Sequence, residues 1–342
     1  MKFIIAKSEL SNLISSIQNV VAQKPTIPIL SNFLIEAEGN ELIITATDLT
    51  VGMRCRTDAK VIEEGATTLP AKCFSQLVRE LTAASIEVGA NPSEVTSILA
   101  DSSSFKLHGL ARDEFPALPD LTGAAQFRLD QSVLKDMLYR TSFAVSREDN
   151  RFVLTGVLLK IADGEATFVG TDGKRLSKAR TSIEIDPAFA GEYIIPLKAV
   201  DEVYKNLRDE GLATVYLMND KVAFEANHMI IIAKLLQGDY PDFNRVIPQS
   251  SDINVVLHRE ELTTLLRQIS LFTSETSHSV RFSFAEGELV LTANTTDVGE
   301  GKVSMPVDYS GEPLAIAFNP GFFLDILRHV KTESVNLGIT DS

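Results

Sequence analysis

The chain has 342 residues, of which 44% are hydrophobic and 23% are charged. This length predicts two or three domains, and the composition is that of a soluble globular protein, neither disordered nor fibrous. The formal net charge of −14 excludes a protein that is basic overall and coats nucleic acid, but not one with a local basic surface.

The sequence also indicates the compartment. Its two cysteines, Cys55 and Cys73, are too few for a disulfide framework and indicate free thiols in a reducing cytosol. The apolar run at 3–6 is too short for a signal peptide, and the run at 229–233 is far below the ~20 residues of a membrane span. We therefore expect a cytoplasmic protein that does not enter a membrane.

In chain order, the first predicted helix covers residues 7–24, where apolar residues recur every three or four positions. A hairpin follows at 35–50, because an acid-Gly turn at Gly39 separates two alternating apolar runs. A second helix is predicted at 71–82, directly after Pro70, since proline is tolerated at the first turn of a helix. The other segments alternate apolar and polar residues and are predicted to be strands.

The same elements recur twice more along the chain. Helices are predicted at 129–142, 196–208, 258–272 and 320–331, and hairpins at 160–175 and 283–298. The turn glycines Gly39, Gly164 and Gly287 lie 125 and 123 residues apart, and the prolines Pro70, Pro196 and Pro320 lie 126 and 124 apart. Agreement among such landmarks predicts three tandem copies of one module of ~125 residues.

Each module has the pattern β-α-β-β-β twice over, which predicts an α+β fold with helices covering one face of a sheet. The predicted domains are 1–124, 125–248 and 249–342. The third copy is the shortest, because residues 333–342 align with 213–220, just before a hairpin at 222–236 in the second copy. We therefore expect the third module to lack its last two strands.

A search for catalytic motifs finds none. The five histidines form neither an i, i+4 pair nor a metal-like group with cysteine, and no G-x-S-x-G motif is present. The stretch 299–302 lacks the spacing of a phosphate-binding loop, and its position after the third hairpin indicates a strand end. The Thr-Asp pair at 171–172 recurs at 47–48 and indicates a structural turn. We predict no catalytic residue, no metal and no cofactor.

Several unusual segments, correctly ordered and spaced, carry a family resemblance. They are KPTIPIL at 24–30, GATTLPAKCF at 65–74, DEFPALPD at 113–120, RFVLTGVLL at 151–159, GTDGKRL at 170–176 and GDYPDFNRVIP at 238–248. Together they resemble the bacterial β sliding clamps, the β subunits of DNA polymerase III that serve as processivity factors. The resemblance extends to Ser342, where members of the family would continue into a final strand.

This resemblance implies a head-to-tail homodimer whose six modules form a ring around duplex DNA, with helices inside and sheets outside. Twelve helices, each ~10 Å across, leave an opening of about 28 Å, wider than a duplex. The six predicted helices carry a net charge of +4 and the remainder −18, and a weakly basic lining favours sliding over sequence reading. Taken alone, this charge is explained equally well by lysines that keep helices soluble. The basic residues that match DNA-facing positions of the family are Lys24, Lys72, Arg79, Lys198, Lys205 and Lys331.

The resemblance also implies protein partners: the catalytic subunit of DNA polymerase III, the clamp loader and other proteins that carry a short clamp-binding peptide. This peptide would enter a pocket between copies two and three, although core packing is an equal explanation for Leu154 and Val246. Because one pocket wall would come from the missing final strand, we expect clamp-binding peptides to bind weakly or not at all. The matching residues are Leu154, Thr171, Gly173, Lys174, Arg175, Leu176, Pro241, Arg245 and Val246.

The dimer interface of the family joins copy one of a chain to copy three of the next. The matching residues here are Phe105 and Leu107, on a predicted edge strand, and Leu271 and Phe272. An apolar edge strand is a liability unless it pairs, which favours a partner at this edge. The acidic stretch at 297–300 would add a charge complementary to Lys106.

Two other classes of protein are compatible with parts of the sequence. An enzyme with its site at Lys174 and Arg175, such as a phosphate-ester hydrolase, would need a carboxylate cluster or a metal set, which is not found. A three-module surface or carbohydrate-binding protein would need a secretion signal and exposed aromatic residues, yet the chain has no Trp. Retention on circular DNA, with loss after linearisation, would distinguish all three classes.

Overall fold

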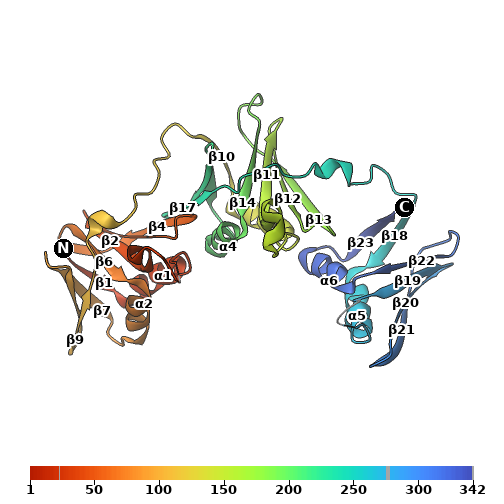
Figure 1. Cartoon of the computed structure of the whole chain (residues 1–342), viewed down its shortest axis with the longest axis horizontal. Coiled ribbons are helices and arrows are strands. Elements are labelled where there is room, and N and C mark those ends of the chain that lie inside the picture. Colours follow the sequence, from red (N-terminus) through yellow and green to blue (C-terminus); the bar gives the residue numbers. More distant parts are fainter. Residues whose placement is uncertain (23, 275–277, 341–342) are drawn as a thin grey trace. The chain divides into compact units, whose positions relative to one another are not determined.

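A computed structural model describes residues 1–22, 24–274 and 278–340 (Figure 1). The chain divides into two compact units, residues 1–240 and 241–342. Within the described residues there are six α-helices and 23 strands, which confirms the predicted α+β class. The order β-α-β-β-β, twice over, recurs along the chain as predicted, with one extra short strand in the first copy.

Unit 1 begins with the first copy of the module. Its two helices are α1 (Lys7–Ile17) and α2 (Ala71–Glu80), each of which directly follows a strand. The strands are β1 (Lys2–Ala6), β2 (Asn32–Glu38), β3 (Glu41–Thr47), β4 (Val51–Asp58), β5 (Lys60–Glu63), β6 (Gly65–Pro70), β7 (Ser85–Ala90), β8 (Val95–Ala100) and β9 (Ser103–His108). The extra strand is β5, which pairs with β1 at the edge of a five-stranded sheet.

The second copy has the same layout. Its helices are α3 (Gln131–Ser142) and α4 (Leu197–Asn206), and an irregular 3-10 segment, η3 (Asp149–Thr155), follows α3. Its strands are β10 (Ala125–Asp130), β11 (Gly156–Ala162), β12 (Glu165–Thr171), β13 (Leu176–Ser182), β14 (Gly191–Pro196), β15 (Leu212–Leu217), β16 (Lys221–Ala226) and β17 (Met229–Lys234).

One continuous sheet joins the two copies in unit 1. Strand β17 of copy two pairs antiparallel with β4 of copy one, with Met229 opposite Cys55 and Ile232 opposite Gly52. This pairing completes an eight-stranded sheet in the order β10-β15-β16-β17-β4-β3-β2-β6. Most buried apolar residues of both copies, from Phe3 to Leu235, accordingly form one cluster, and Ile29, Leu30 and Phe115 form a smaller one.

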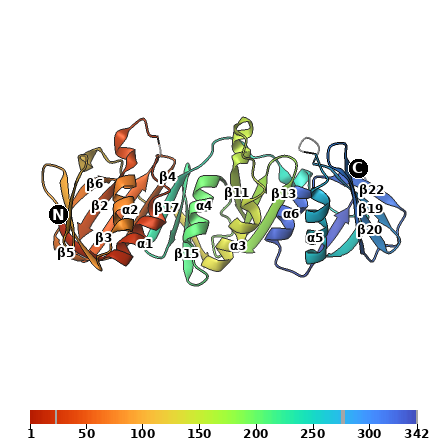
Figure 2. The ribbon, with the colours of Figure 1, turned by 90° about the horizontal axis from the view of Figure 1, so that it is seen from below.

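The four helices of unit 1 lie side by side on one side of its sheets, in the order α2, α1, α4, α3 (Figure 2). Each is amphipathic: α1, for example, buries Leu10, Leu13, Ile14 and Ile17 against the core. This spacing of apolar residues is the signal that predicted the helix. The opposite, polar face of the row is therefore free to present charged side chains.

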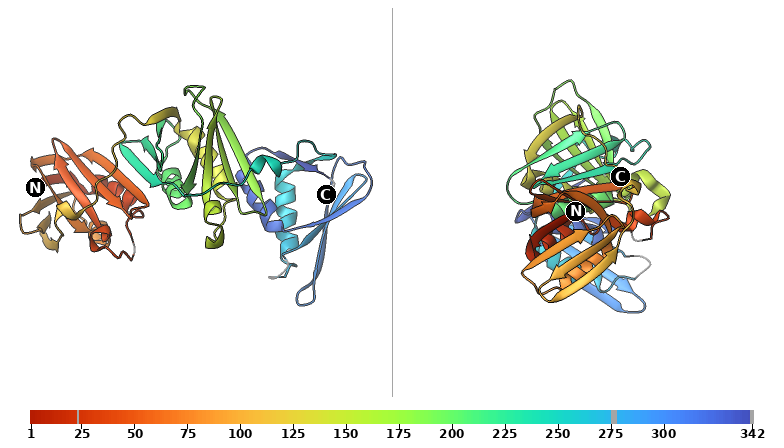
Figure 3. Two further views of the ribbon diagram at one scale, coloured as in Figure 1. Left: turned by 45° about the horizontal axis from the view of Figure 1, so that its top comes forward. Right: turned by 90° about the vertical axis from the view of Figure 1, so that its left-hand side faces the viewer.

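Unit 2 is built on the third copy of the module. Helices α5 (Arg259–Ser270) and α6 (Pro320–His329) pack against each other, and the strands β20 and β21 form a long hairpin (Figure 3). Within its described residues the strands are β18 (Ile253–His258), β19 (Val280–Ala285), β20 (Glu288–Thr295), β21 (Gly299–Pro306), β22 (Leu314–Phe318) and β23 (Ser334–Ile339). Counterparts of β16 and β17 are not among these described strands, and β23 pairs with β18 alone.

The predicted helices begin close to the observed ones, but the first ends earlier than expected. Helix α1 ends at Ile17, although the apolar pattern continues through Val20 and Val21 to residue 24. Val20 lies in the turn after the helix, where its N–H donates to the Ile17 carbonyl, and its side chain is fully buried in the core. The apolar pattern therefore extends beyond the end of α1, because Val20 in the following turn is also buried in the core.

Candidate nucleic-acid interface and protein-docking surfaces

Three of the predicted DNA-contacting residues are exposed cations of the first copy. Lys24 follows α1, and Lys72 and Arg79 lie two turns apart on α2. Among the described residues none of the three has an ion pair or a side-chain hydrogen bond. Their charges are therefore available to an external anion.

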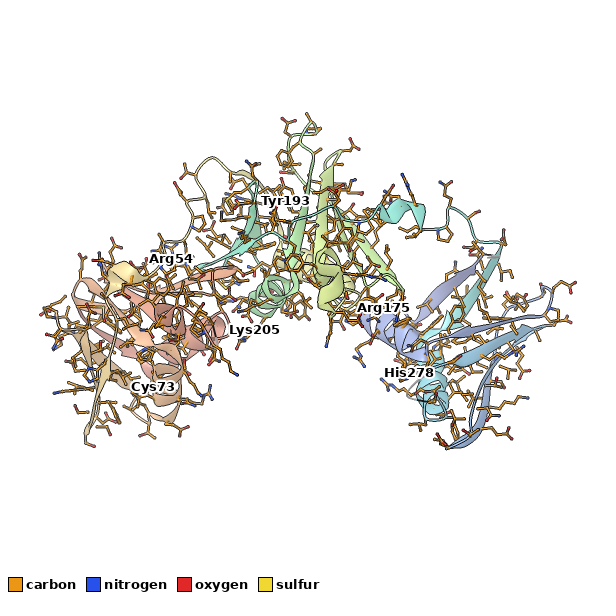
Figure 4. The ribbon with its side chains drawn as sticks, viewed as in Figure 1. Arg54, Cys73, Arg175, Tyr193, Lys205 and His278 are labelled. Carbon is orange, nitrogen blue, oxygen red and sulfur yellow. The ribbon has the colours of Figure 1, made fainter. Side chains whose placement is uncertain are left out.

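Two further predicted cations, on α4 of the second copy, are bonded to the first copy. Lys198 Nζ lies 2.6 Å from Asp48 Oδ2 and donates to the Val20 carbonyl at 3.3 Å. Lys205 Nζ donates to the Ser15 carbonyl at 3.0 Å (Figure 4 labels Lys205). The Ser15 carbonyl lies in the last turn of α1, where the helix dipole favours a cation, and Val20 lies in the turn that follows. Lys198 and Lys205 thus link the two copies, and part of their charge is used inside the protein.

Glu202 lies between these two lysines. It is 7% exposed, and burial raises the pKa of its carboxyl, while Lys205, a hydrogen bond with Asn19 and Lys198 partly oppose that shift. The oxygen Oε2 is buried and, in the described part of the chain, has no hydrogen-bond partner. Burying a carboxylate in this way is costly, even between two cations.

The sixth predicted DNA-contacting residue belongs to unit 2. Lys331 is exposed and follows α6, whose last turn also carries Arg328 and His329. Cations at this position complement the negative end of the helix dipole.

The loop from Thr171 to Arg175, predicted to contact partner peptides, is held rigid by its own polar side chains. The Thr171 hydroxyl donates to the Arg175 carbonyl and accepts from the Gly173 N–H, while Asp172 Oδ1 accepts from the N–H groups of Lys174 and Arg175. The same four bonds recur at Thr47, Asp48, Leu49, Thr50 and Val51 in the first copy. The repeated Thr-Asp pair is therefore a structural turn, as predicted.

Arg175, one of the predicted peptide-contacting residues, lies mostly inside the protein (Figure 4 labels it). Its Nε is 3.1 Å from Asp172 Oδ2, its Nη2 donates to the Phe143 carbonyl at 3.0 Å, and its guanidinium lies 5.5 Å from the centre of the Phe143 ring. Its role is to fix this loop against the end of α3. Lys174 is exposed, Leu176 is half-buried and Leu154 is buried.

A further cation, Arg151, lies at this loop and could not be predicted from the sequence. A Cβ atom placed on Gly173 would lie 2.1 Å from Nη1 of Arg151, so the Arg151 guanidinium rests against the bare backbone of the loop. Gly173 has φ +84°, which favours glycine for a second reason. Arg151 comes from the irregular segment η3, where periodicity carries no signal about side-chain direction.

The other three predicted peptide-contacting residues lie at the start of unit 2. Pro241 and Arg245 are exposed, and Val246 is 70% exposed. Arg245 Nε lies 3.0 Å from Asp242 Oδ2, and Asp242 caps the short helix η4 (Phe243–Arg245). An exposed valine next to a capped turn is a suitable apolar contact for a peptide.

The four predicted dimer residues lie on free surfaces of the two units. Phe105 is 36% exposed and Leu107 is half-buried on β9, which in the described part of the chain pairs only with β8. Leu271 is 73% exposed, directly after α5, and the half-buried Phe272 packs against Gly301 of β21. Strand β21 likewise pairs only with β20 among the described strands.

The described residues also bear on the alternative classes of protein. No group of three or more His, Cys, Asp or Glu side chains among them is placed to hold a metal ion. No helix among them is long and apolar enough to span a membrane.

Comparison with known proteins identifies the family. Models of the DNA polymerase III β subunit match in tandem: the N-terminal domain at residues 1–119, the central domain at 128–242 and the C-terminal domain at 244–342. The β sliding clamp of Chlamydia pneumoniae is 57% identical over 342 residues, which cover 100% of this chain and 93% of that protein. The β sliding clamp of Pseudomonas putida is 31% identical, with 100% and 94% covered.

Solved structures give the same result at lower identity. The DNA polymerase sliding clamp from Bacillus subtilis superposes with a TM-score of 0.95 at 27% identity, covering 99% of this chain and 93% of that one. A sliding clamp from Pseudomonas aeruginosa bound to griselimycin gives a TM-score of 0.96 at 29% identity, with 100% and 93% covered. The chain therefore belongs to the β sliding clamp family, the β subunits of DNA polymerase III.

Proposed function

We propose that the chain is a DNA sliding clamp: two copies close head to tail around duplex DNA and tether the replicative polymerase to it. The observation that carries this proposal is the tandem match of three β-subunit domain models along the chain. The proposal includes three modules, at 1–124, 125–248 and 249–342, and a cytoplasmic location. The clamp holds DNA by enclosing it, so it needs no tight contact.

In this proposal the row of helices in unit 1 faces the DNA. Lys24, Lys72 and Arg79 contribute most there, because no group in the described residues neutralises them. Lys198 and Lys205 contribute less, since each also bonds to the first copy, and Lys331 contributes from the third. Few, weak phosphate contacts hold the duplex near the centre while it slides.

Peptides of the polymerase catalytic subunit, the clamp loader and other clamp-binding proteins would contact the loop Thr171–Leu176 and Leu154. Pro241, Arg245 and Val246 complete the set that the family resemblance implies. Exposed Lys174, together with Arg151, gives the unit 1 part of this surface two cations. It therefore suits a peptide with apolar anchors and an acidic flank.

The internal repeat supplies a template for the dimer interface. Strand β9 is the counterpart of β17, and β21 is the counterpart of β4, because each occupies the same place in its copy. In unit 1, β17 pairs with β4 and closes the junction between two modules. We infer that β9 of one chain pairs in the same way with β21 of the partner chain.

The β4–β17 pair also predicts which residues of β9 and β21 lie opposite each other in the dimer. Transferring the β4–β17 register, in which Ile232 lies opposite Gly52, places Lys106 opposite Glu300 of the partner chain. The same register places Phe105 opposite Gly301, beside which Phe272 packs. Apolar contact and opposite charges then coincide at one edge, which is how a cross-strand pair gains stability.

Primer extension on a singly primed circular template tests the proposal. With the cognate polymerase and clamp loader, we expect the wild-type chain to give full-length products under single-hit conditions. The double variant Leu271→Ala, Phe272→Ala should give short products, because its ring does not close. Equal product lengths with and without the wild-type chain would contradict the proposal.

A further inference from the structure

Unit 1 contains a cavity of about 400 Å³ between its eight-stranded sheet and the segment 112–121, which joins copies one and two. Leu34, Thr45, Arg54 and Ile230 form the floor of this cavity, because they lie opposite one another across β2, β3, β4 and β17. This row crosses the seam at which β17 pairs with β4. The cavity therefore belongs to the junction of the first two copies.

The segment 112–121 forms the opposite wall and is fixed to the rest of unit 1 at two points. Phe115 is buried in a small apolar cluster, and Leu118 lies against the bare backbone of Gly52 in β4, where a Cβ atom would collide with it. Two prolines of the segment also line the cavity and restrict its backbone. A wall that is already fixed loses little conformational entropy when a ligand enters.

Most of the lining is apolar, and its charges balance. Its charged members among the described residues are two arginines, Arg54 and Arg112, and two acids, Glu36 and Asp113. Arg54 Nη2 lies 3.0 Å from Glu36 Oε2, and Arg112 Nε lies 3.5 Å from Asp113 Oδ1 (Figure 4 labels Arg54). A strongly charged ligand would meet a group of its own sign at this rim.

The same lining suits a peptide with aliphatic side chains and no net charge. The apolar walls accept the side chains, as in most ligand pockets. An extended backbone carries both N–H donors and C=O acceptors, and a rim with guanidinium and carboxylate groups offers a partner to each. The chemistry of the cavity therefore favours a peptide over a small anion or cation.

The internal repeat relates this cavity to the peptide surface proposed for the second junction. Pro116 and Leu121, which line the cavity, stand where the second junction has Pro241 and Val246. The cavity is completed by Ile230 and Ile232 of β17, the strand that follows the first junction in the sheet. At the first junction, the joining segment and this strand thus enclose one recess.

We propose that the cavity at the first junction binds a short extended peptide of a partner protein, with aliphatic side chains against Leu34, Leu121 and Ile230. It is a second peptide site on each chain, separate from the loop Thr171–Leu176. The inference goes beyond the proposed function and rests on it in one respect, because the peptide surface of the second junction supplies the comparison.

The test titrates a capped, neutral peptide, acetyl-Gly-Leu-Ser-Leu-Gly-amide, into the full chain with ¹³C-labelled isoleucine methyl groups. The methyl signals of Ile230 and Ile232 report on the cavity, and that of Ile62, exposed on β5, is the reference. Ala66→Phe fills the cavity from β6, where Ala66 is half-buried. Ala84→Phe adds the same ring at an exposed position of the same copy, outside the lining, and is the matched control.

We expect the Ile230 and Ile232 signals of the wild type to shift until the site is saturated, while the reference signal stays in place. Ala66→Phe should weaken binding about tenfold or more, because the added ring occupies the space that the peptide needs. Ala84→Phe should match the wild type. No shift at Ile230 and Ile232 in the wild type, or equal affinity in Ala66→Phe, would overturn the proposal.

Three controls identify the occupant and keep the result decisive. The peptide acetyl-Gly-Ser-Ser-Ser-Gly-amide lacks the aliphatic side chains, and equally tight binding of it would contradict the proposal. Shifts of the same two signals with chain concentration alone would show that a second copy covers the cavity, and would also contradict it. Should Ala66→Phe not fold, Leu121→Asp places a carboxylate in the apolar wall, and we expect a similar loss of binding.

A variant of the second junction separates the two sites. Val246→Asp changes only the surface proposed there, so the titration of Ile230 and Ile232 should stay as in the wild type. Primer extension with the wild-type chain is measured separately. Its failure would contradict the proposed function, while the methyl titration decides the cavity on its own.

Discussion

Residues of one chemical type take different roles in this chain according to the copy in which they stand. Lys72 and Lys198 occupy the same place in their modules, and so do Arg79 and Lys205. Among the described residues, Lys72 and Arg79 have no side-chain hydrogen bond or ion pair. Lys198 and Lys205 instead donate to carbonyls in and just after the last turn of α1. The sequence predicted four equivalent cations, because Asp48, the partner of Lys198, is 150 residues away.

Gly173 offers a direct test of the loop geometry. Gly173→Ala should cost about 1 kcal/mol of unfolding free energy for the positive φ, and more for the displacement of Arg151. Gly164→Ala is the control, since Gly164 has φ +72° but no atom closer than 3.8 Å to the added Cβ.

Urea unfolding of these variants with and without Arg151→Ala completes a double-mutant cycle. We expect a coupling of about 0.5 kcal/mol or more between positions 173 and 151, and none between 164 and 151. Additive effects at both glycines would show that Arg151 does not rest on Gly173.

Glu202 predicts a pH dependence of stability. Burial raises its pKa in the folded chain above the ordinary 4.5, so the folded state binds this proton more tightly than the unfolded state. The stabilisation from this group is fully present below the unfolded pKa and is lost as the pH rises through the folded pKa.

Glu202→Gln removes this titration, so we expect the variant to gain stability relative to the wild type as the pH rises from 4 to 7.5. Urea unfolding of both proteins at several pH values measures the difference. A stability difference that is the same at every pH would contradict a raised pKa at this position.

At the scale of secondary structure, the helix starts and the hairpins could be predicted from local signals, and some ends could not. The acid-Gly turns at Gly39, Gly164 and Gly287 lie in the turns between the paired strands, because a positive φ is needed there. The predicted end of α1 is too late. Val20 fits the apolar period of the helix, but it is buried in the turn that follows the helix. Strand β5 is an addition to the predicted β-α-β-β-β pattern, and its short, mostly exposed sequence shows no apolar alternation that would single it out.

The edges of β9 and β21 support a specific prediction about assembly. If Lys106 lies opposite Glu300 of the partner chain, Lys106→Glu places like charges across the interface and weakens the dimer. Glu300→Lys should do the same, and the double variant should restore the dimer, because it reverses the pair.

Sedimentation equilibrium measures all three variants against the wild type. We expect at least tenfold weaker dimers for each single variant and recovery of most of that loss in the double variant. A double variant no stronger than the singles would contradict the register that the β4–β17 pair implies.

At the scale of the whole molecule, three copies of one module could be recognised from spacings of 123 to 126 residues alone. The family assignment agrees with that reading, and it confirms a non-catalytic subunit rather than an enzyme. The sheet continuous across the first two copies could not be predicted, since no local signal pairs β4 with β17. The net charge of −14 is compatible with a protein that surrounds DNA, because the six predicted helices are less acidic than the rest of the chain.

The proposed function requires the protein to hold DNA by enclosing it. The most direct measurement loads the fluorescently labelled chain onto nicked circular DNA, washes it at high salt, and then cuts the circle once. We predict that the protein remains on the circle through the wash and leaves within minutes of linearisation. Dissociation at the same rate from circular and linear DNA would contradict the account.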